Sequence, residues 1–289
     1  MNTTWTSPAS WSRARGPSLG GVALQVFLLV VALTCVVPFA WMVGTSFKTF
    51  DQVLAYPPRL IPDPAVTTSW ESMFSDIPIV RYLFNSIVVT GTIVVSQTIC
   101  NILAAYVFAR IEFRGREVVF LIYLGSMMVP SQVTLIPQYI LVSKLGWIDS
   151  YLALTVPFLF GSAFGTFLLR QFFMSLPRDL DDAARLDGAG HLRILWNVIL
   201  PQAKAAVATF AVFCFLFFWN DFLWPLIVTN SDDHKTLQVG LATLSRSYFG
   251  TNWPVMMATT TFTVLPVLIL YAFAQRYFVQ GIAMTGLKG

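Results

Sequence analysis

The stretch VALQVFLLVVALTCVVPFAWMVG, from Val22 to Gly44, holds 23 residues and no charged side chain. At 1.5 Å per residue, a helix of this length crosses the ~30 Å hydrocarbon core of a bilayer. Five similar runs follow, of which one carries a single carboxylate; they are Ile87–Ala109, Val118–Val142, Leu152–Leu169, Ala205–Val228 and Met257–Ala274. None of the runs alternates as a barrel strand does, and backbone groups in hydrocarbon need internal partners, so the runs predict six transmembrane helices.

The composition agrees with an all-α membrane protein. Of 289 residues 56% are hydrophobic and 11% are charged, against roughly 25% charged in soluble domains. This excludes an ordinary soluble enzyme and a disordered chain. We expect an N-terminal segment 1–21, a transmembrane domain 22–280 and a C-terminal tail 281–289. Arg13 and Arg15 resemble the start of a secretory signal, but the apolar run after them is too long, so we interpret it as a retained first span.

Several chemistries find no support in the sequence. The net charge of +4 is too small and too scattered for nucleic acid. The three cysteines lie in apolar runs, and the two histidines fall on opposite sides of the predicted membrane, so we expect no disulfide, metal or cofactor. The chain has no phosphate-binding G-x-x-x-x-G-K-[ST] motif. An ion-coupled pump usually needs ionisable groups inside the bilayer, and Asp221 is the one acid within a span, so we expect the energy of any uphill transport to come from elsewhere.

Cation counting predicts the orientation. With the N-terminus inside, the inner segments hold 12 Lys and Arg and the outer segments hold 6, whereas the acids divide 6 inside and 8 outside. This bias predicts that both termini are cytoplasmic and that the segments 47–82 and 229–254 are outside. Prolines inside several runs predict kinked helices, either for packing or around an interior path.

The inner segment 173–203 carries the most information. Ser175 is expected to cap a helix that has Pro177 in its first turn, with three aspartates near its start. Gly188 is expected to end that helix with a positive φ, and a second helix then runs to Pro201. From these residues alone the segment is either a capped connector between two spans or a docking surface with small residues such as Ala183.

The spacing in this segment resembles a family motif. Asp182-Ala183-Ala184, three residues, Gly188, nine residues and then Val198-Ile199-Leu200-Pro201 resembles the Glu-Ala-Ala loop of ATP-binding-cassette importer permeases. Asp182 replaces glutamate and Val198 replaces isoleucine. Similarity to the smaller permease of the maltose transporter and its relatives continues over nearly the whole chain, in Thr45–Lys48, Trp219–Asp221, Arg185–Ala189, Arg276–Gly281 and Leu287–Gly289, with a departure at Ile282–Thr285.

The resemblance implies a type I importer permease fold in a bacterial plasma membrane. It implies four kinds of partner: a second homologous permease, two ATP-binding-cassette ATPase subunits, an extracytoplasmic solute-binding protein and the bilayer. It also implies that the chain itself has no catalytic residue. The residues expected to couple to the ATPase are Asp182, Ala183, Ala184, Arg185, Asp187, Gly188 and Pro201, and those expected to contact it from the tail are Gly281, Lys288 and Gly289.

Other assignments stay open at this stage. Asn220 and Asp221 are candidates for the translocation path, but Asp221 could equally bond a neighbouring helix or an unwound turn before Pro225. The expected solute is a sugar, with glycerol-3-phosphate or a glycerophosphodiester as the alternative. A stand-alone facilitator or channel would need no docking segment. A membrane-embedded transferase would need clustered acids or metal ligands, which the sequence lacks.

Overall fold

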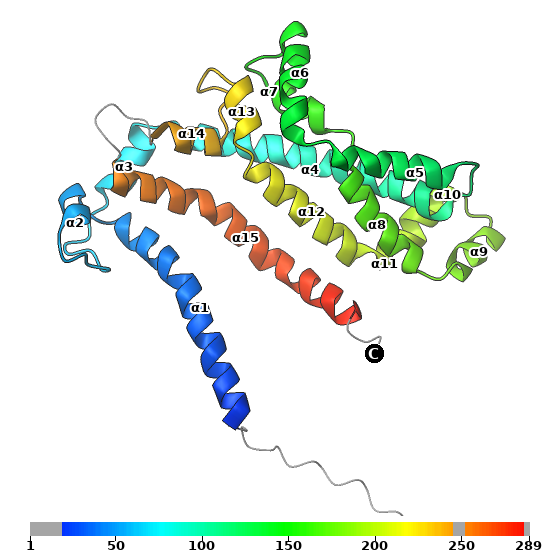
Figure 1. Cartoon of the computed structure of the whole chain (residues 1–289), viewed down its shortest axis with the longest axis horizontal. Helices are drawn as coiled ribbons and strands as arrows, with labels where there is room; N and C mark the ends of the chain where they lie inside the picture. The colour runs from blue at the N-terminus through cyan, green and yellow to red at the C-terminus, as the bar shows by residue number, and fades with distance from the viewer. Residues whose placement is uncertain (1–18, 245–251, 286–289) are drawn as a thin grey trace, which may run out of the picture.

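The computed structural model describes residues 19–244 and 252–285, which form helices and connecting turns without a strand in those ranges (Figure 1). The elements are α1 Leu19–Thr45, α2 Phe50–Leu54, α3 Thr68–Ser75, α4 Ile79–Arg110, α5 Arg116–Gly125, η1 Ser126–Met128, α6 Ser131–Lys144, α7 Tyr151–Thr155, η2 Val156–Phe158, α8 Ala163–Ser175, α9 Asp179–Leu186, α10 His191–Ile194, η3 Leu195–Ile199, α11 Leu200–Gln202, α12 Lys204–Trp219, α13 Leu223–Val228, α14 Leu237–Leu244 and α15 Trp253–Thr285.

Helix α4 is the central element of the fold. It has 32 residues, so it is about 48 Å long. Its side chains enter three buried apolar clusters, with Tyr82 in the cluster beside α3, Ile93 in the cluster beside α7, and Ile102 in the cluster beside α8. In Figure 1, α9 lies beyond one end of α4, and α3 and α14 lie at the other. Helix α4 therefore contacts elements at both ends of the molecule.

Three of the predicted spans are single long helices. The runs Val22–Gly44, Ile87–Ala109 and Met257–Ala274 lie within α1, α4 and α15. Each of these helices is long and apolar enough to cross a membrane, and the number rises to six if each of three bent helix pairs is one span. The all-helical prediction is confirmed over the described residues. Each of the other three runs overlaps one of the bent helix pairs.

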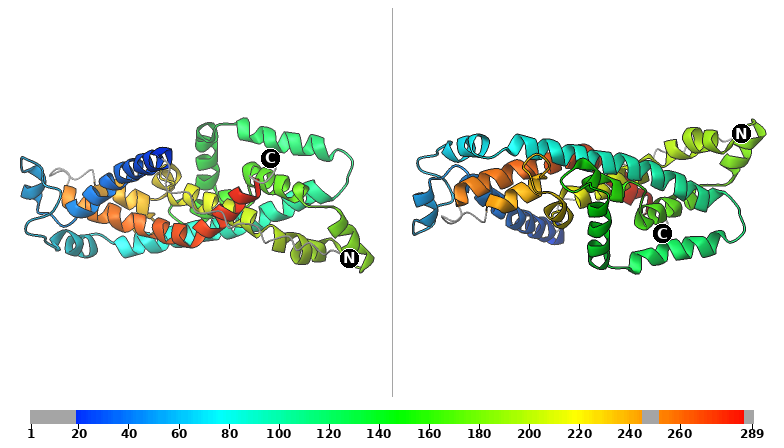
Figure 2. Two further views of the ribbon diagram at one scale, coloured as in Figure 1. Left: turned by 90° about the horizontal axis from the view of Figure 1, so that it is seen from below. Right: turned by 90° about the horizontal axis from the view of Figure 1, so that it is seen from above.

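The run Val118–Val142 is a broken segment. Its two parts, Arg116–Met128 and Ser131–Lys144, meet at 91°, and Figure 2 shows α6 standing across the direction of α5. Val129, between them, has extended dihedrals of φ −82° and ψ 114°. A residue before proline is disfavoured in the helical region, and Pro130 lacks the N–H that would continue the helix. Pro130 therefore favours a break at this point.

The run Leu152–Leu169 bends by 42° between α7 and α8, and polar side chains of α4 face this break. The Ser96 hydroxyl donates to the Leu159 carbonyl at 2.8 Å, and the Gln97 amide donates to the Phe158 carbonyl at 2.8 Å. The Asn101 side-chain oxygen accepts from the Ser162 backbone N–H at 3.0 Å. Backbone groups freed inside an apolar region need such partners. These bonds explain why an apolar run like α4 carries buried amides.

Helix α1 leaves the body of the protein, as Figure 1 shows. In its most apolar window no residue is buried, and Leu24, Phe27 and Leu29 are all exposed. An apolar helix of this length without cover within the chain is typical of a helix in contact with lipid or another membrane protein.

Polar contacts join the first turns of α4 to the start of α14 and the residues before it. The Tyr82 hydroxyl donates to the Asp232 carboxylate at 2.7 Å, and the Asn85 amide donates to two backbone carbonyls before α14, at 2.9 and 2.8 Å. The Leu237 backbone N–H donates to the Ser86 hydroxyl at 2.8 Å. The described part of the segment 229–254 is thus fixed to α4; residues 245–251 lie outside the described ranges.

Candidate functional site

The segment between α8 and α12 forms a short helix, a turn and a second helical stretch, as predicted. One detail of the prediction is wrong. The Ser175 hydroxyl donates to the Phe172 carbonyl at 2.7 Å, so Ser175 ends α8 instead of capping the next helix. Helix α9 begins at Asp179, and its first turn contains three aspartates. Their charges lie near the positive end of the helix dipole, which stabilises the start of this short helix.

Gly188 forms the turn after α9. Its φ is +76°, as predicted, and its N–H donates to the Arg185 carbonyl at 3.0 Å. The Ala189 N–H donates to the Ala184 carbonyl at 2.9 Å, which closes the end of the helix. A side chain with a Cβ is disfavoured at this φ by about 1–2 kcal/mol. Among the described residues, no heavy atom lies within 4 Å of the position that a Cβ would take at Gly188.

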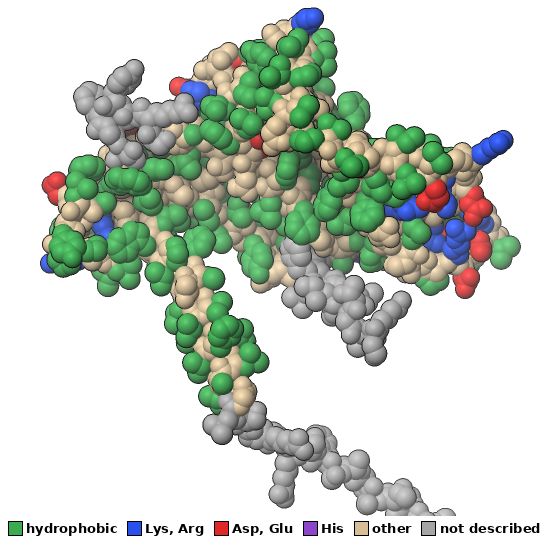
Figure 3. All heavy atoms as spheres, viewed as in Figure 1, with side chains coloured by type: hydrophobic (Ala, Val, Ile, Leu, Met, Phe, Trp, Pro, Cys, Tyr) green, Lys and Arg blue, Asp and Glu red, His purple; other side chains and the backbone are tan. Residues whose placement is uncertain are grey.

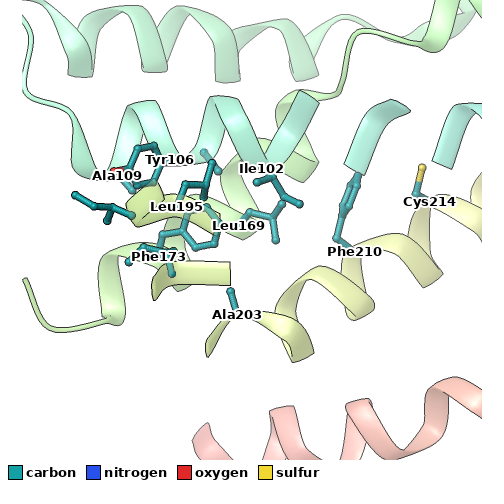
Figure 4. Packing of buried hydrophobic residues seen from close by; sticks show 12 residues of the cluster. Ile102, Tyr106, Ala109, Leu169, Phe173, Leu195, Ala203, Phe210 and Cys214 are labelled. Carbon is teal, nitrogen blue, oxygen red and sulfur yellow. The ribbon is translucent and has the colours of Figure 1, made fainter. Parts of the chain in front are cut away.

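The second stretch anchors the segment in the core. It runs through α10, a π-helical turn and α11, and Pro201 lies in its last part. Ile194, Leu195 and Ile199 are fully buried, in the same cluster as Phe173 (Figure 4). Burying three branched aliphatic side chains contributes several kcal/mol, on the order of 2 kcal/mol each. The stretch is thus fixed to α4 and α8.

By contrast, α9 exposes most of its surface. Asp182, Ala183 and Arg185 are exposed, and only Ala184 of the small residues packs partly against the core. Leu186 is 90% exposed at the end of α9. Figure 3 shows acidic and basic side chains gathered at this end of the molecule. A single exposed apolar side chain is ordinary on a protein surface, so Leu186 shows that this face of α9 is accessible.

A buried arginine holds α9 against the body. The Arg110 guanidinium, at the end of α4, donates to the Asp181 carboxylate at 2.7 Å. It also donates to the backbone carbonyls of Phe173 at 2.6 Å and Leu176 at 3.0 Å. The Arg110 and Asp181 side chains are 3% and 7% exposed. A cavity of ≈ 410 Å³ opens beside this pair and reaches His191.

Two further ion pairs lie at the same end. Arg170 binds Glu117 with distances of 2.8 and 3.0 Å and stacks on the Phe120 ring, which ties α8 to α5. Arg178 binds Glu112 at 2.8 Å on the surface. The hydrogen bond and charge of Arg178 lower the pKa of Glu112 below its ordinary value. From the sequence, Arg110 counts only as one of the inner cations, because nothing in the local sequence indicates a partner 71 positions away.

The other candidate residues lie apart from this segment. Asn220 and Asp221 fall in a non-helical break between α12 and α13, so the fifth predicted span is interrupted there. The Asp221 carboxylate accepts bonds from backbone N–H groups at the start of α13, which favours the unwound-turn alternative for its local role. Gly281 lies in α15, which continues to Thr285 past the expected boundary of the tail. Lys288 and Gly289 lie outside the described residues.

Comparison with known proteins identifies the kind of chain. Residues 101–284 match the family model of the binding-protein-dependent transport system inner membrane component. An arabinooligosaccharides transport system permease protein, AraQ, from Halalkalibacterium halodurans is 32% identical over 92% of this chain and 96% of its own. An sn-glycerol-3-phosphate transport system permease protein, UgpE, from Brucella abortus is 32% identical over 92% of this chain and 96% of its own.

A solved structure agrees with the sequence relatives. A chain of a bacterial ABC transporter involved in the import of the acidic polysaccharide alginate superposes with a TM-score of 0.81 at 26% identity, over 93% of this chain and 100% of that chain. The matched region of the family model includes α8–α12, and so it includes the exposed α9 and the Gly188 turn. The chain belongs to the family of inner membrane components of binding-protein-dependent transport systems, the permease subunits of ABC importers.

Proposed function

We propose that this permease works in an ATP-driven importer of a carbohydrate and that its segment 173–203 is the docking site for an ATPase subunit. The partners are a second permease, two ATP-binding-cassette subunits and an extracytoplasmic solute-binding protein. The observation that supports the docking role is the exposure of α9, with Leu186 90% exposed on a helix that is fixed to the core from behind. The coupling residues are Asp182, Ala183, Ala184, Arg185, Asp187, Gly188 and Pro201.

The proposed topology has six crossings and both termini in the cytoplasm, with a transmembrane domain 22–280. The cation bias of 12 to 6 supports this orientation, because Lys and Arg favour the cytoplasmic side. The charged end of the molecule, which includes α9, then faces the ATPases. The opposite end, with the segment before α14, faces the binding protein.

Transport follows from the way α4 joins the two ends. Closure of the ATPases moves α9, and the contacts of Arg110 transmit that displacement to α4 and α8. Because α4 extends to the contacts of Tyr82 and Asn85, its displacement also reaches the outer segment. Rocking of one permease against the other then opens the path to one side at a time. ATP can shift this equilibrium only through contacts that differ between the two states.

An uncharged sugar fits the path better than a phosphate ester. Both solute classes occur among the relatives, since AraQ is named for arabinooligosaccharides and UgpE for sn-glycerol-3-phosphate. Within the six apolar runs, Asp221 is the one side chain charged at neutral pH, and it is an acid. A phosphate would need a cation there to offset its desolvation. We therefore place Asn220 and Asp221 on the path of a neutral polyhydroxy solute.

The tail is proposed to touch the ATPases through Gly281, Lys288 and Gly289. Truncation after Gln280 should lower transport-coupled ATP hydrolysis while the complex still forms. Hydrolysis equal to that of the full chain would mean that the tail has no such contact.

Co-purification tests the proposed function as a whole. The permease should be expressed with the second permease and ATPase encoded beside it, purified through a tag on this chain, and placed in proteoliposomes. Bound ATPase, and solute uptake that depends on ATP and on the binding protein, are expected. Uptake by this chain alone, without ATPase, would identify it as a facilitator.

The same proteoliposomes distinguish the two solute classes. An arabinooligosaccharide and sn-glycerol-3-phosphate should be offered separately, each with the cognate binding protein. Uptake of the arabinooligosaccharide without uptake of sn-glycerol-3-phosphate supports the sugar assignment. Uptake of sn-glycerol-3-phosphate alone would show that the solute is a phosphate ester.

A further inference from the structure

Of the eight residues of α9, all of them described, only the carboxylate of Asp181 is buried. A short surface helix is ordinarily held by an apolar stripe, and in α9 only Ala184 packs partly against the apolar core. The fully buried contact that anchors α9 on the protein body is the charge pair of Asp181 with Arg110.

The partner of that carboxylate joins three elements at once. Arg110 belongs to the last turn of α4, Asp181 belongs to α9, and the carbonyls of Phe173 and Leu176 end α8. The Phe173 carbonyl also accepts from the Leu176 N–H at 3.3 Å, and the guanidinium adds a donor there and another at the Leu176 carbonyl. Its planar fork allows several donors to act together, which a lysine cannot reproduce.

We infer that Arg110 and Asp181 are positioning residues for coupling: they make α9 move as one body with the ends of α4 and α8, so that displacement of α9 is transmitted and not absorbed by a loose loop. This inference rests on the proposed docking role of α9. A buried ion pair contributes little net stability compared with an apolar replacement, so a role in fixing geometry accounts better for its presence.

An exposed ion pair at the same end offers a matched control. Arg178 and Glu112 also join the start of α9 to the segment after α4, at 2.8 Å, but their side chains are 61% and 74% exposed. Exposed pairs contribute little to structure. If any connection between α9 and the end of α4 were sufficient for coupling, removing either ion pair would have the same effect on transport.

The first experiment compares Asp181→Asn with Asp181→Glu and Glu112→Gln in the assembled complex. Asp181→Asn keeps the size of the side chain and removes its charge. We expect it to lower binding-protein-stimulated ATP hydrolysis and uptake at least tenfold, while ATPase still co-purifies and basal hydrolysis is unchanged. Asp181→Glu should restore at least half of the stimulation, and Glu112→Gln should stay within twofold of the parent. Normal stimulation in Asp181→Asn would overturn the inference.

A second variant covers the case in which a lone buried charge prevents folding. Arg110→Gln with Asp181→Asn removes both charges together and leaves no unpaired ion. It should reach the membrane at the parent level and still show the tenfold loss of stimulation. If the double variant couples normally, the charge pair is not a positioning device.

A third measurement does not depend on the ATPase. A spin label at Asp179→Cys, in a background without the three native cysteines, reports the mobility of α9 in the purified permease. The mobility should rise in Asp181→Asn and stay unchanged in Glu112→Gln. Equal mobility in both would refute the positioning role. If the mobility rises in Asp181→Asn but the parent permease does not bind the ATPase, the proposed docking function is refuted and the positioning role stands.

Discussion

Replacing Gly188 by valine should remove most of the uptake without removing the permease from the membrane. The cost comes from the backbone, because φ at Gly188 is +76° and no described heavy atom would meet the new Cβ within 4 Å. The left-handed conformation costs an L-residue about 1–2 kcal/mol. If this free energy shifts the turn away from its docking conformation, the competent population falls roughly 5- to 30-fold. A side chain there would also stand between α9 and a docked partner.

The assay is solute uptake in membranes, normalised to the amount of permease, together with recovery of ATPase on the purified permease. Gly188→Asn separates the two causes, because asparagine tolerates a positive φ. It should recover part of the uptake if the backbone is the main cost. Gly115→Val is the matched control, since Gly115 has φ +83°, lies in the turn between α4 and α5, and would likewise meet no described atom. Normal uptake in Gly188→Val, or an equal loss in Gly115→Val, would refute this reasoning.

Three further predictions concern other parts of the molecule. Asp182→Ala should lower the free energy of unfolding by less than about 1 kcal/mol, because the charge lies in the exposed first turn of α9. It should cause a partial uptake defect that Asp182→Glu avoids better than Asp182→Asn does. Equal uptake in the Glu and Asn variants would contradict this. Deleting about six residues around Leu241 to Ser247 should leave membrane insertion intact and uncouple uptake from the binding protein, and uptake at the parent level would contradict a role of this segment in coupling. The hydrogen bonds of Lys235 and Tyr82 lower the pKa of Asp232 below its ordinary value, so their stabilisation of the segment before α14 is present at neutral pH and is lost as the pH falls through that lowered value. The protection of backbone amides there, measured by hydrogen exchange and corrected for the intrinsic pH dependence of exchange, should fall in acid, and Asp232→Asn should reduce that pH dependence.

The apolar runs were sufficient to predict the long helices, because the lipid solvent imposes a simple length rule. They were not sufficient to predict the breaks. Pro130 ends a helix and is followed by a 91° bend, whereas α1 and α15 continue through Pro38 and Pro266. A proline removes one hydrogen bond in each case, and the packing of the neighbouring helices decides whether the helix continues.

At the candidate site the local features were predictable and the tertiary ones were not. The positive φ of Gly188 follows from its place after a short helix, and the structure has it. The prediction that Ser175 caps α9 was wrong, because a serine can bond a preceding carbonyl as readily as a following N–H. In the sequence, Arg110 cannot be told apart from any other cation at the end of a membrane span. Its role depends on Asp181 and on α8, which only the fold brings near.

Photo-crosslinking from α9 tests directly whether α9 docks on the ATPase subunit. A benzophenone probe on Leu186→Cys, in a background without native cysteines, should be irradiated in inverted membranes that contain the co-expressed ATPase. The same probe on Phe74→Cys, which is exposed on α3 at the opposite end, is the control. An adduct with the mass of permease plus ATPase is expected from position 186 and none from position 74. Absence of that adduct from position 186 in a complex that co-purifies with ATPase would contradict docking at α9.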